Sequence, residues 1–418
     1  MHASKSMTVV LAFLSVLFLV GQGCPPPASD GLNPDTSGDG GSDSTGDGSS
    51  GDGSSGDGSS TDGTSDGSGD TPTTDGDDTT SETLALFDEL WNTFDQEYSY
   101  FTYKGIDWND VRSRYRSYFE TDLSADAFAQ QVGEMIQELH DWHVWVQAPG
   151  GDAIGCDETV ETNAPARLFM GYTESGAYET LGTNVIYHAW LTGNVAHIVI
   201  DTLSTSAFDS VSDADIEALF VTYQSADAMI IDIRDNSGGN ENNAIKFASR
   251  FVNEPVDYGY VQTRNGPDHD DFDPLITKTL QPSTGTHYDG PVYGLIGQRC
   301  LSSAEWFTLM LRAAGATLIG DKTRGGSGNP NTHELANGVQ YGVSTWIAYG
   351  SAYGIWGYLH TGDDGDDLVE IEDNGIMPDI WLAPGTSVDE SNDHVLEAAL
   401  DDISWGGTDF DDSFEWSL

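Results

Sequence analysis

The stretch Pro291-Val-Tyr-Gly-Leu-Ile-Gly297 runs directly into Gln298-Arg-Cys-Leu-Ser-Ser-Ala-Glu305. The first part is apolar and ends in glycine, which predicts a short buried strand. Downstream, apolar residues recur at three- and four-residue spacing, as on one face of a helix: Phe307, Met310, Leu311 and Ala314. Ser302 and Ser303 are therefore expected where a strand turns into the N-terminus of a helix.

A serine at such a junction has two interpretations. The free amides and the positive dipole end of the helix suit a developing oxyanion, and a serine there is a nucleophile if a base reaches it. Alternatively, Ser302 or Ser303 simply caps the helix. The other motifs of the chain help to decide between a nucleophile and a helix cap.

The same order of elements occurs upstream. Residues 228–233 predict a buried strand that leads into Arg234-Asp-Asn-Ser-Gly-Gly239, and a helical pattern follows over residues 243–251. Further along, residues 339–348 predict a strand and residues 393–400 a closing helix. Strands alternating with helices predict an α/β core, which we place at residues 147–400. Residues 82–146 carry several amphipathic helical patterns and predict a small N-terminal helical subdomain.

The two ends of the chain have other compositions. Residues 1–24 are predicted to be a signal peptide, because an apolar run is followed by Gly21-Gln-Gly-Cys24. This end is similar to a lipoprotein signal with Cys24 as the lipidated residue, although Gly21 stands where leucine is usual; plain secretion is the alternative. Residues 25–81 predict a disordered Gly/Ser/Asp linker, and residues 401–418 an acidic tail.

The charge of the chain restricts its partners. The formal net charge is −54, and 13 of the 69 acidic residues lie in the linker. A field of this sign argues against binding to nucleic acid or to an anionic membrane surface. The membrane contact that we expect is through the N-terminal lipid anchor of an exported protein. Cys156 and Cys300 could pair in an oxidising compartment, but two cysteines favour neither state.

Two further patterns suggest metal sites. His140 and His143 are three residues apart, but a third ligand at convincing spacing is missing. The acidic runs at residues 268–273 and 363–367 would also fit a calcium-dependent adhesin or carbohydrate binder. Such runs are more often solvated loops. The sequence thus predicts no metal site and no cofactor.

Five motifs in order resemble the S41-type serine peptidases, the family of the C-terminal processing and tricorn proteases. They are Glu138-Leu-His-Asp-Trp-His143, Asp232-Ile-Arg-Asp-Asn-Ser-Gly-Gly239, Ser302-Ser-Ala-Glu305, Gly320-Asp-Lys-Thr-Arg-Gly-Gly326 and Glu372-Asp-Asn-Gly-Ile-Met-Pro-Asp-Ile380. The resemblance covers residues 84–400 and implies a ClpP/crotonase-like α/β core. It also implies that Ser302 is the nucleophile, and that backbone amides of Ser303 and of Gly238 or Gly239 bind the oxyanion.

The resemblance leaves two arrangements for the base. Many members use a Ser-Lys dyad, but the lysine position reads Gly326 here, and Lys322 stands elsewhere in the motif. The tricorn-like branch uses a histidine and a distant glutamate, and His143 and Glu372 fall on those positions. We therefore expect a Ser302-His143-Glu372 arrangement.

The implied function is that of an exported serine peptidase acting on peptides or proteins. The family often carries a PDZ domain before the core, but the residues between 146 and 185 are too few for one, so no PDZ domain is evident. The alternative is a non-catalytic ligand- or peptide-binding protein on the same fold, as in retinoid-binding relatives.

Overall fold

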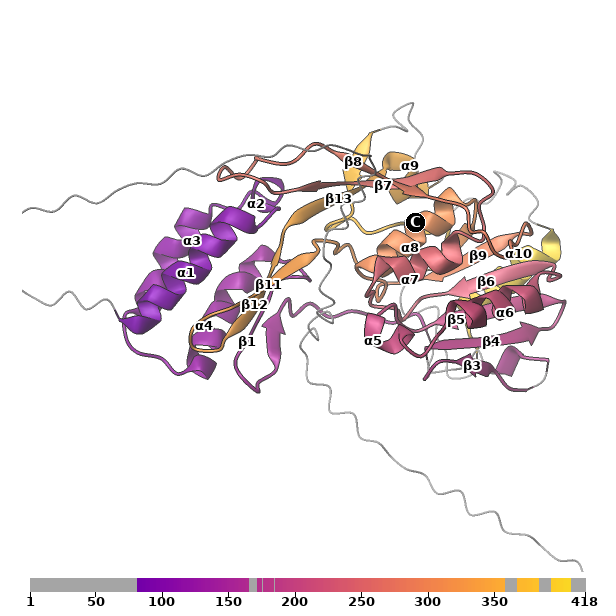
Figure 1. The fold of residues 1–418 in the computed structure, drawn as a ribbon, viewed down its shortest axis with the longest axis horizontal. Helices are drawn as coiled ribbons and strands as arrows, with labels where there is room; N and C mark the ends of the chain where they lie inside the picture. The colour runs from indigo at the N-terminus through magenta and orange to yellow at the C-terminus, as the bar shows by residue number, and fades with distance from the viewer. Residues whose placement is uncertain are drawn as a thin grey trace, which may run out of the picture. The chain divides into compact units, whose positions relative to one another are not determined.

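The computed structural model describes residues 81–164, 171–174, 176–183, 185–357, 367–382 and 392–406. The predicted signal peptide with Cys24 and all of the predicted linker except Ser81 lie outside the described residues, as does the acidic tail from residue 407. Within the described ranges, no helix combines the length and apolar character needed to cross a membrane. Figure 1 shows the fold as a ribbon.

The first described segment is helical, as predicted. It contains α1 (Glu82–Glu97), α2 (Phe101–Lys104), α3 (Trp108–Tyr115), the 3-10 turn η1 (Arg116–Phe119), α4 (Ala125–Ile136) and the 3-10 turn η2 (Gln137–Leu139). Two of the helices begin at side-chain caps: Asp107 accepts a hydrogen bond from the Asp110 amide, and Ser124 accepts one from the Ala127 amide.

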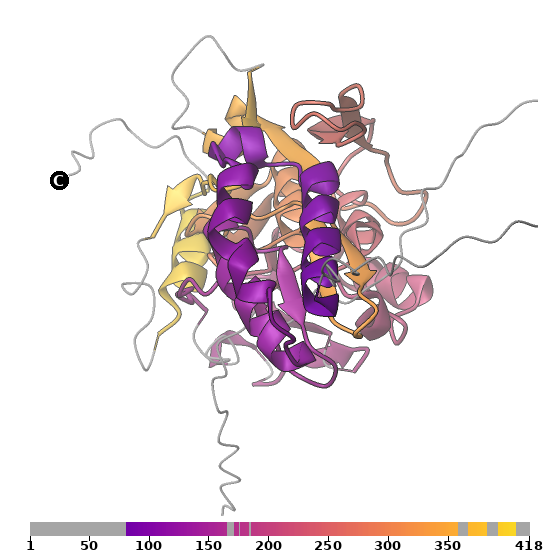
Figure 2. The same ribbon diagram turned by 90° about the vertical axis from the view of Figure 1, so that its left-hand side faces the viewer.

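These helices pack on an antiparallel sheet whose strand order is β11-β12-β1-β2. The strands are β11 (Pro330–Glu334), β12 (Gln340–Ser344), β1 (Trp145–Gln147) and β2 (Ala153–Gly155). One apolar cluster joins helices and sheet, and it includes Phe94, Trp108, Val146 and Tyr341. Figure 2 shows the purple helices in front of these strands. The N-terminal helices therefore share their core with strands that come much later in the chain.

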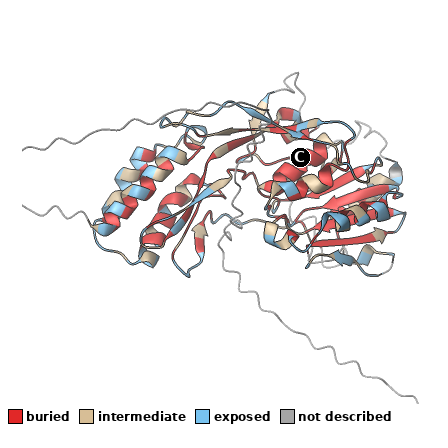
Figure 3. Cartoon of the chain, in the orientation of Figure 1, coloured by how far each residue is buried: buried red, intermediate tan, exposed pale blue. Residues whose placement is uncertain are grey.

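A seven-stranded sheet forms the centre of the α/β core, in the order β15-β10-β9-β6-β5-β4-β3. Its strands are β15 (Ile380–Trp381), β10 (Thr317–Gly320), β9 (Val292–Ile296), β6 (Ala228–Asp232), β5 (Val195–Ile200), β4 (Ile186–Leu191) and β3 (Glu179–Leu181). The first five run parallel, and the last two are antiparallel additions. Every residue of β6 and β9 is buried, as expected for parallel strands covered on both faces (Figure 3).

Alternate residues of β6 contribute to two apolar layers. Ile231 belongs to a cluster with residues of α6 (Asp213–Tyr223), α7 (Glu241–Ala248) and α8 (Ser303–Ala313). Ile230 belongs to a second cluster with residues of α10 (His394–Trp405). The sheet is thus covered by helices on both faces, with α8 almost wholly buried. The short helix α5 (Thr205–Phe208) precedes α6.

A third sheet, in the order β14-β13-β7-β8, was not expected in full. It contains β14 (Leu368–Glu370), β13 (Trp346–Ser351), β7 (Val256–Thr263) and β8 (Ile276–Leu280), with α9 (Ala352–Trp356) after β13. The sequence predicts one strand over residues 339–348, but the structure has two, β12 and β13. Thr345 lies between them and donates its amide to the Gly328 carbonyl. The chain there passes from one sheet to another, which a one-dimensional pattern does not reveal.

The closing helix is longer than predicted. The sequence places its end at Leu400, whereas α10 continues to Trp405. The first residues of the predicted acidic tail are therefore helical. Cys156 and Cys300 are both buried, and no disulfide joins them in the part of the chain that the structure describes. The Cys300 thiol donates to the Ile233 carbonyl.

Candidate active site

Ser302 lies at the junction that the sequence predicts. It follows β9 through residues 297–301 and is the N-cap of α8, with a backbone φ of 58° and ψ of −126°. A positive φ is costly for a residue with a Cβ, and such strain concentrates at functional sites. The Ser302 amide donates to the Gly326 carbonyl at 2.9 Å, which holds the strained turn against the glycine-rich segment.

Glu305 fastens this turn from inside the protein. Its side chain is fully buried, and its two oxygens accept four hydrogen bonds. Oε1 accepts from the Thr323 hydroxyl at 2.7 Å and the Gly325 amide at 2.8 Å; Oε2 accepts from the Gly326 amide at 3.0 Å and the Ser302 amide at 3.2 Å. Burial raises the pKa of Glu305 to about 7, although these four donors lower it.

The predicted oxyanion amides gather around Ser302. A Cβ added to Gly238 would lie 2.9 Å from Ser302 Cβ and 3.0 Å from the Ser303 amide nitrogen, so glycine lets this loop touch the turn. The Gly238 amide itself donates to Asn236 Oδ1 at 2.8 Å. The amides of Gly239 and Ser303 make no hydrogen bond within the described ranges, and the Ser303 hydroxyl donates to the Gly239 carbonyl at 2.5 Å. Gly239 and Ser303 are thus the amides left to bind an oxyanion.

His143 is buried beside the same segment. It is 1% exposed, its amide donates to Asp141 Oδ1 at 2.8 Å, and its Nδ1 accepts from the Gly328 amide at 3.3 Å. Its Nε2 is buried without a hydrogen-bond partner. Burial lowers the pKa of His143; the Asp141 charge raises it and the Arg324 cation lowers it further. In the described residues, no hydrogen bond joins His143 to Ser302.

Glu372 is the centre of a buried ionic group. Its Oε1 lies 3.0 Å from the Lys104 ammonium, which comes from α2 and also donates to Asp373 at 2.8 Å and to the His140 carbonyl at 3.0 Å. Burial and the nearby charge of Asp141 raise the pKa of Glu372 well above its ordinary value, and Lys104 opposes them. Burial alone would lower the pKa of Lys104, but the carboxylates raise it, so the lysine stays charged.

The tripeptide Gly326-Ser327-Gly328 connects the three predicted residues. The Gly326 carbonyl accepts from Ser302, the Ser327 amide donates to Glu372 Oε2 at 3.4 Å, and the Gly328 amide donates to His143. Successive peptide units therefore contact the nucleophile, the carboxylate and the base. The structure brings the three residues to one segment but does not put Glu372 in contact with His143.

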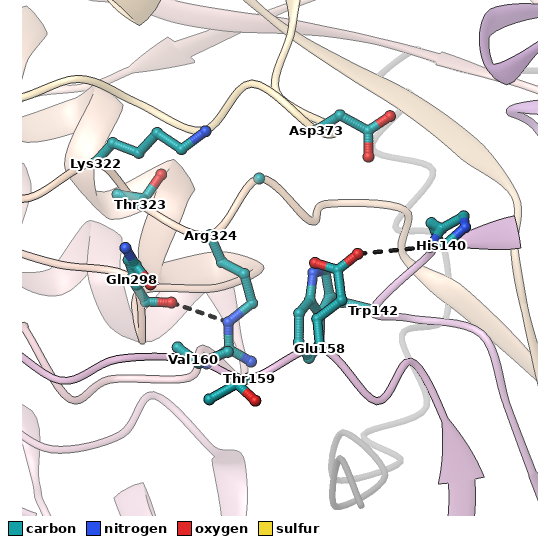
Figure 4. Close-up of a pocket in the computed structure, with 11 residues that line it drawn as sticks. His140, Trp142, Glu158, Thr159, Val160, Gln298, Lys322, Thr323, Arg324 and Asp373 are labelled. Carbon is teal, nitrogen blue, oxygen red and sulfur yellow. Dashed lines mark hydrogen bonds and ion pairs between the residues drawn. The ribbon is translucent and has the colours of Figure 1, made fainter. Parts of the chain in front are cut away.

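A pocket of about 340 Å³ adjoins this segment (Figure 4). Its walls include Trp142, which precedes His143, and the turn at Lys322, Thr323, Arg324 and Gly325. The Trp142 side chain packs on Gly326, because a Cβ added there would lie 3.1 Å from Trp142 Cβ. Lys322 lines the pocket, and within the described residues its side chain makes no hydrogen bond or ion pair with the Ser302 turn.

The two histidines of the possible metal pair differ in their exposure to solvent. The His140 side chain is largely exposed and is 3.5 Å from Glu158, whereas His143 is buried. In the ranges that the structure describes, no group of three or more histidine, cysteine or acidic side chains could hold a metal ion.

Two family models match parts of the chain. The model of the tricorn protease C1 domain matches residues 80–137, and that of peptidase family S41 matches residues 194–380. The predicted resemblance to the S41-type peptidases is therefore confirmed. That family consists of serine-type hydrolases, so the match supports a peptidase function, and the predicted α/β fold class is confirmed.

Solved structures show the same fold. The "putative peptidase from Parabacteroides merdae ATCC 43184" is 25% identical, with a TM-score of 0.65 over 77% of this chain and 97% of that chain. Mature CPAF is 13% identical, with a TM-score of 0.58 over 78% of this chain and 98% of that chain. No curated protein matches the chain. The likeness to CPAF concerns the fold alone.

The sequence patterns alone give no functional role to three residues of the site: Lys104, Asp141 and Glu305. Glu305 had a signal, since an acidic residue three positions after an N-cap serine is a capping pattern that ties the carboxylate to the N-cap amide. Asp141 stood within the histidine motif. Lys104 had no signal, because its partner Asp373 is 269 residues away.

Proposed function

We propose that the protein is an exported serine peptidase that cleaves peptides or proteins through an acyl-enzyme on Ser302. The observation that carries the proposal is the contact of Ser302, Glu372 and His143 with three consecutive residues, Gly326-Ser327-Gly328. A strained serine at a helix N-terminus beside two unpaired amides adds to it.

In the proposed reaction, Ser302 Oγ bonds to the scissile carbonyl carbon while its proton passes to the His143 imidazole. The amides of Gly239 and Ser303 stabilise the oxyanion. Collapse breaks the C–N bond, and the imidazolium gives its proton to the leaving amine. A water then repeats the sequence on the acyl group and frees Ser302.

His143 has to be released before it accepts a proton. With Nδ1 accepting from Gly328, the neutral ring carries its proton on Nε2. The bond is long at 3.3 Å, and catalytic hydrogen bonds often tighten only in the substrate complex. We propose that substrate binding opens the contact to Gly328 and turns the ring toward Ser302.

Glu372 acts on His143 indirectly in this proposal. The adjacent Ser327 and Gly328 amides contact Glu372 and His143, respectively, and the charge of Asp141 raises the pKa of both side chains. Lys104 opposes the effect of burial on the pKa of Glu372 and so favours its carboxylate form. The carboxylate form in turn favours the imidazolium that forms during the reaction. Glu372 and Lys104 are therefore positioning residues.

The Ser-Lys dyad receives less support. Lys322 lines the pocket. The residues that follow it contact the Ser302 turn instead: the Thr323 hydroxyl donates to Glu305, and the Arg324 amide donates to the Cys300 carbonyl. A non-catalytic binding protein remains the second candidate function, because Ser302 and His143 make no hydrogen bond with each other. Export and a lipid anchor on Cys24 rest on the sequence of residues 1–24.

The test is covalent labelling with a serine-directed fluorophosphonate. We expect the intact protein to be labelled with a stoichiometry that approaches one, and Ser302→Ala to lose the label. Ser303→Ala is the matched control, because its hydroxyl donates to Gly239 and only its amide takes part in the reaction. Equal labelling of the intact protein and Ser302→Ala, or none across pH 5–9, would exclude Ser302 as the nucleophile.

A further inference from the structure

The pocket beside the site has an unusual charge balance for so acidic a chain. Of the four lysines in the described ranges, Lys104, Lys246 and Lys278 each form an ion pair with a carboxylate, and Lys322 does not. Lys322 is partly buried and lines the pocket (Figure 4). Because carboxylates greatly outnumber cations in this protein, an unpaired ammonium in a concave site indicates that its partner comes from outside.

The carboxylates that line the same pocket lie beside basic groups other than Lys322. Asp373 accepts from Lys104 at 2.8 Å, and Glu158 lies 3.5 Å from His140. Neither Asp373 nor Glu158 forms an ion pair with Lys322. Within the described residues, Lys322 therefore lines the pocket without a carboxylate partner.

Arg324 adds a second, fixed cation. Its guanidinium lies over the Trp142 ring at 4.5 Å, and its Nε donates to the Gln298 carbonyl at 2.9 Å. Trp142 and Val160 give the pocket apolar wall area beside the charges. A ligand with an aliphatic stem and a carboxylate end would match such a lining.

The pocket is also placed to receive part of a peptide. Trp142 precedes His143, and Gly325 precedes Gly326, whose carbonyl accepts from the Ser302 amide. The Arg324 amide donates to the Cys300 carbonyl, two residues before Ser302. A chain bound at Ser302 therefore has the pocket within a few residues of its scissile bond.

We propose that this pocket is a substrate subsite that binds a carboxylate of the peptide, with Lys322 as its principal counter-ion. The inference rests on the proposed peptidase function and names its substrate class: peptides with an acidic side chain, or a free C-terminal carboxylate, close to the cleaved bond. Lys322 is a binding residue, and it takes no part in proton transfer.

Binding to the catalytically silent Ser302→Ala variant tests the subsite without chemistry. The probes are alanine-rich octapeptides in which one Glu is moved along the chain, each matched by a Gln peptide and each made with a free or an amidated C-terminus. We expect a Glu or free-acid peptide to bind about tenfold more tightly than its neutral match, equal to ~1.4 kcal/mol. A preference in the amidated Glu set identifies a side-chain carboxylate, and one in the free-acid Gln set identifies the C-terminus.

Variants assign the preference to Lys322. In the Ser302→Ala background, Lys322→Gln should abolish the preference and Lys322→Arg should keep most of it. Lys246→Gln is the matched control, because it removes the same charge from an ion pair on α7 outside the pocket. Thermal unfolding of each variant verifies that it is folded.

The outcomes separate the two proposals. A fluorophosphonate label on Ser302 with equal binding of charged and neutral peptides refutes the subsite and leaves the peptidase intact. A Lys322-dependent preference without any label supports the subsite and refutes the peptidase mechanism. A preference that persists in Lys322→Gln also overturns the subsite.

Discussion

Two fully buried carboxylates, Glu305 and Glu372, border the same glycine-rich segment in very different surroundings. Glu305 accepts four hydrogen bonds from neutral donors that lie within 24 residues of one another. Glu372 faces charges: Lys104 at 3.0 Å and Asp141, whose charge raises its pKa. One carboxylate is held by local dipoles and the other by ions from distant parts of the chain.

The difference separates two tasks of an active site. Neutral donors fix the geometry of Glu305, and with it the strained Ser302 turn, without adding a counter-ion near the nucleophile. The ions around Glu372 set an electrostatic field on the side where His143 lies, and their balance depends on each member. We therefore infer that the Glu305 region supplies shape and the Glu372 region supplies proton chemistry.

The largest expected effect is that of His143→Ala. If the Glu372 region supplies the proton chemistry, turnover should fall by roughly 10⁴–10⁶, the loss seen when a triad member is removed. Steady-state kinetics on a folded variant measures it. Asp141→Asn is the companion variant, expected to cost less, because it removes a charge beside the base and keeps an acceptor for the His143 amide. Near-normal turnover in His143→Ala would assign the chemistry elsewhere.

The pH dependence of the intact protein follows from the same base. His143 accepts a proton only when neutral, and its pKa is lowered by burial. Activity should therefore be lost as pH falls, with an acid limb below the ordinary histidine value of about 6.5. A limb in kcat/KM that lies above that value would contradict the burial of His143 as the dominant influence.

Glu305→Gln should lower turnover by roughly 100-fold, the cost of a small misplacement of reacting groups. One amide oxygen can serve two donors, but the amide NH₂ would face two others, such as the Ser302 and Gly326 amides. KM should change less than kcat, because the substrate surface is kept. A loss confined to KM would mean that Glu305 shapes binding and does not hold the Ser302 turn.

The stability of the protein should also report on Glu305. Its pKa is about 7 in the folded chain and near 4.5 when unfolded, so the folded state binds the proton more tightly. The contribution is full below about pH 4.5 and is lost as pH rises through about 7, by up to ~3 kcal/mol. Glu305→Gln should remove this pH dependence from the free energy of unfolding, measured in denaturant at several pH values. An unchanged dependence would place the titration at another group.

Much of the site could be predicted because its parts are local. The pattern of residues 291–305 predicts a strand, a turn and the start of a helix in order. The resemblance to the S41-type peptidases then predicts Ser302 as the nucleophile at this turn. The carboxylate cradle of Glu305 is local too, since its donors all lie between residues 302 and 326. Local patterns of this kind are what a sequence displays directly.

The missed features depend on long-range contacts. Lys104 reads as an ordinary polar residue at a helix end, and only folding brings it to Asp373 and Glu372. The two strands at residues 339–348 read as one, because the change of sheet at Thr345 depends on its contact with Gly328. Pairing across the fold has no periodic signal in one dimension.

Lys104→Met and Glu372→Gln sharpen the comparison as a pair. Each should reduce turnover by roughly tenfold to 100-fold, the range for residues that orient a catalytic group. Removing only the lysine leaves a buried charge and should cost about 3–5 kcal/mol of stability, whereas the double variant should cost less than the sum. Lys278→Met, which opens a partly exposed pair with Glu241, is the control. Strictly additive losses of stability in the double variant would show that Lys104 and Glu372 do not act as an ion pair.

The smallest expected effect comes from Thr323, which links the two carboxylate regions. Its hydroxyl donates to Glu305 Oε1 and accepts from the Ile376 amide, both at 2.7 Å, and Ile376 lies in the loop that carries Glu372. Thr323→Val keeps the shape but removes both bonds and leaves a buried amide unpaired, which should cost about 1–3 kcal/mol of stability. Turnover should fall only several-fold, because the other three donors to Glu305 remain.

Thr323→Ser retains the hydroxyl and should recover both stability and turnover. Combining Thr323→Val with Glu372→Gln then asks whether the regions communicate. If the hydroxyl transmits the position of the Glu372 loop to the Ser302 turn, the double variant should lose less than the product of the single losses, because the link is already broken. Losses that multiply would show two independent regions, one for shape and one for proton chemistry, joined only by the backbone of residues 326–328.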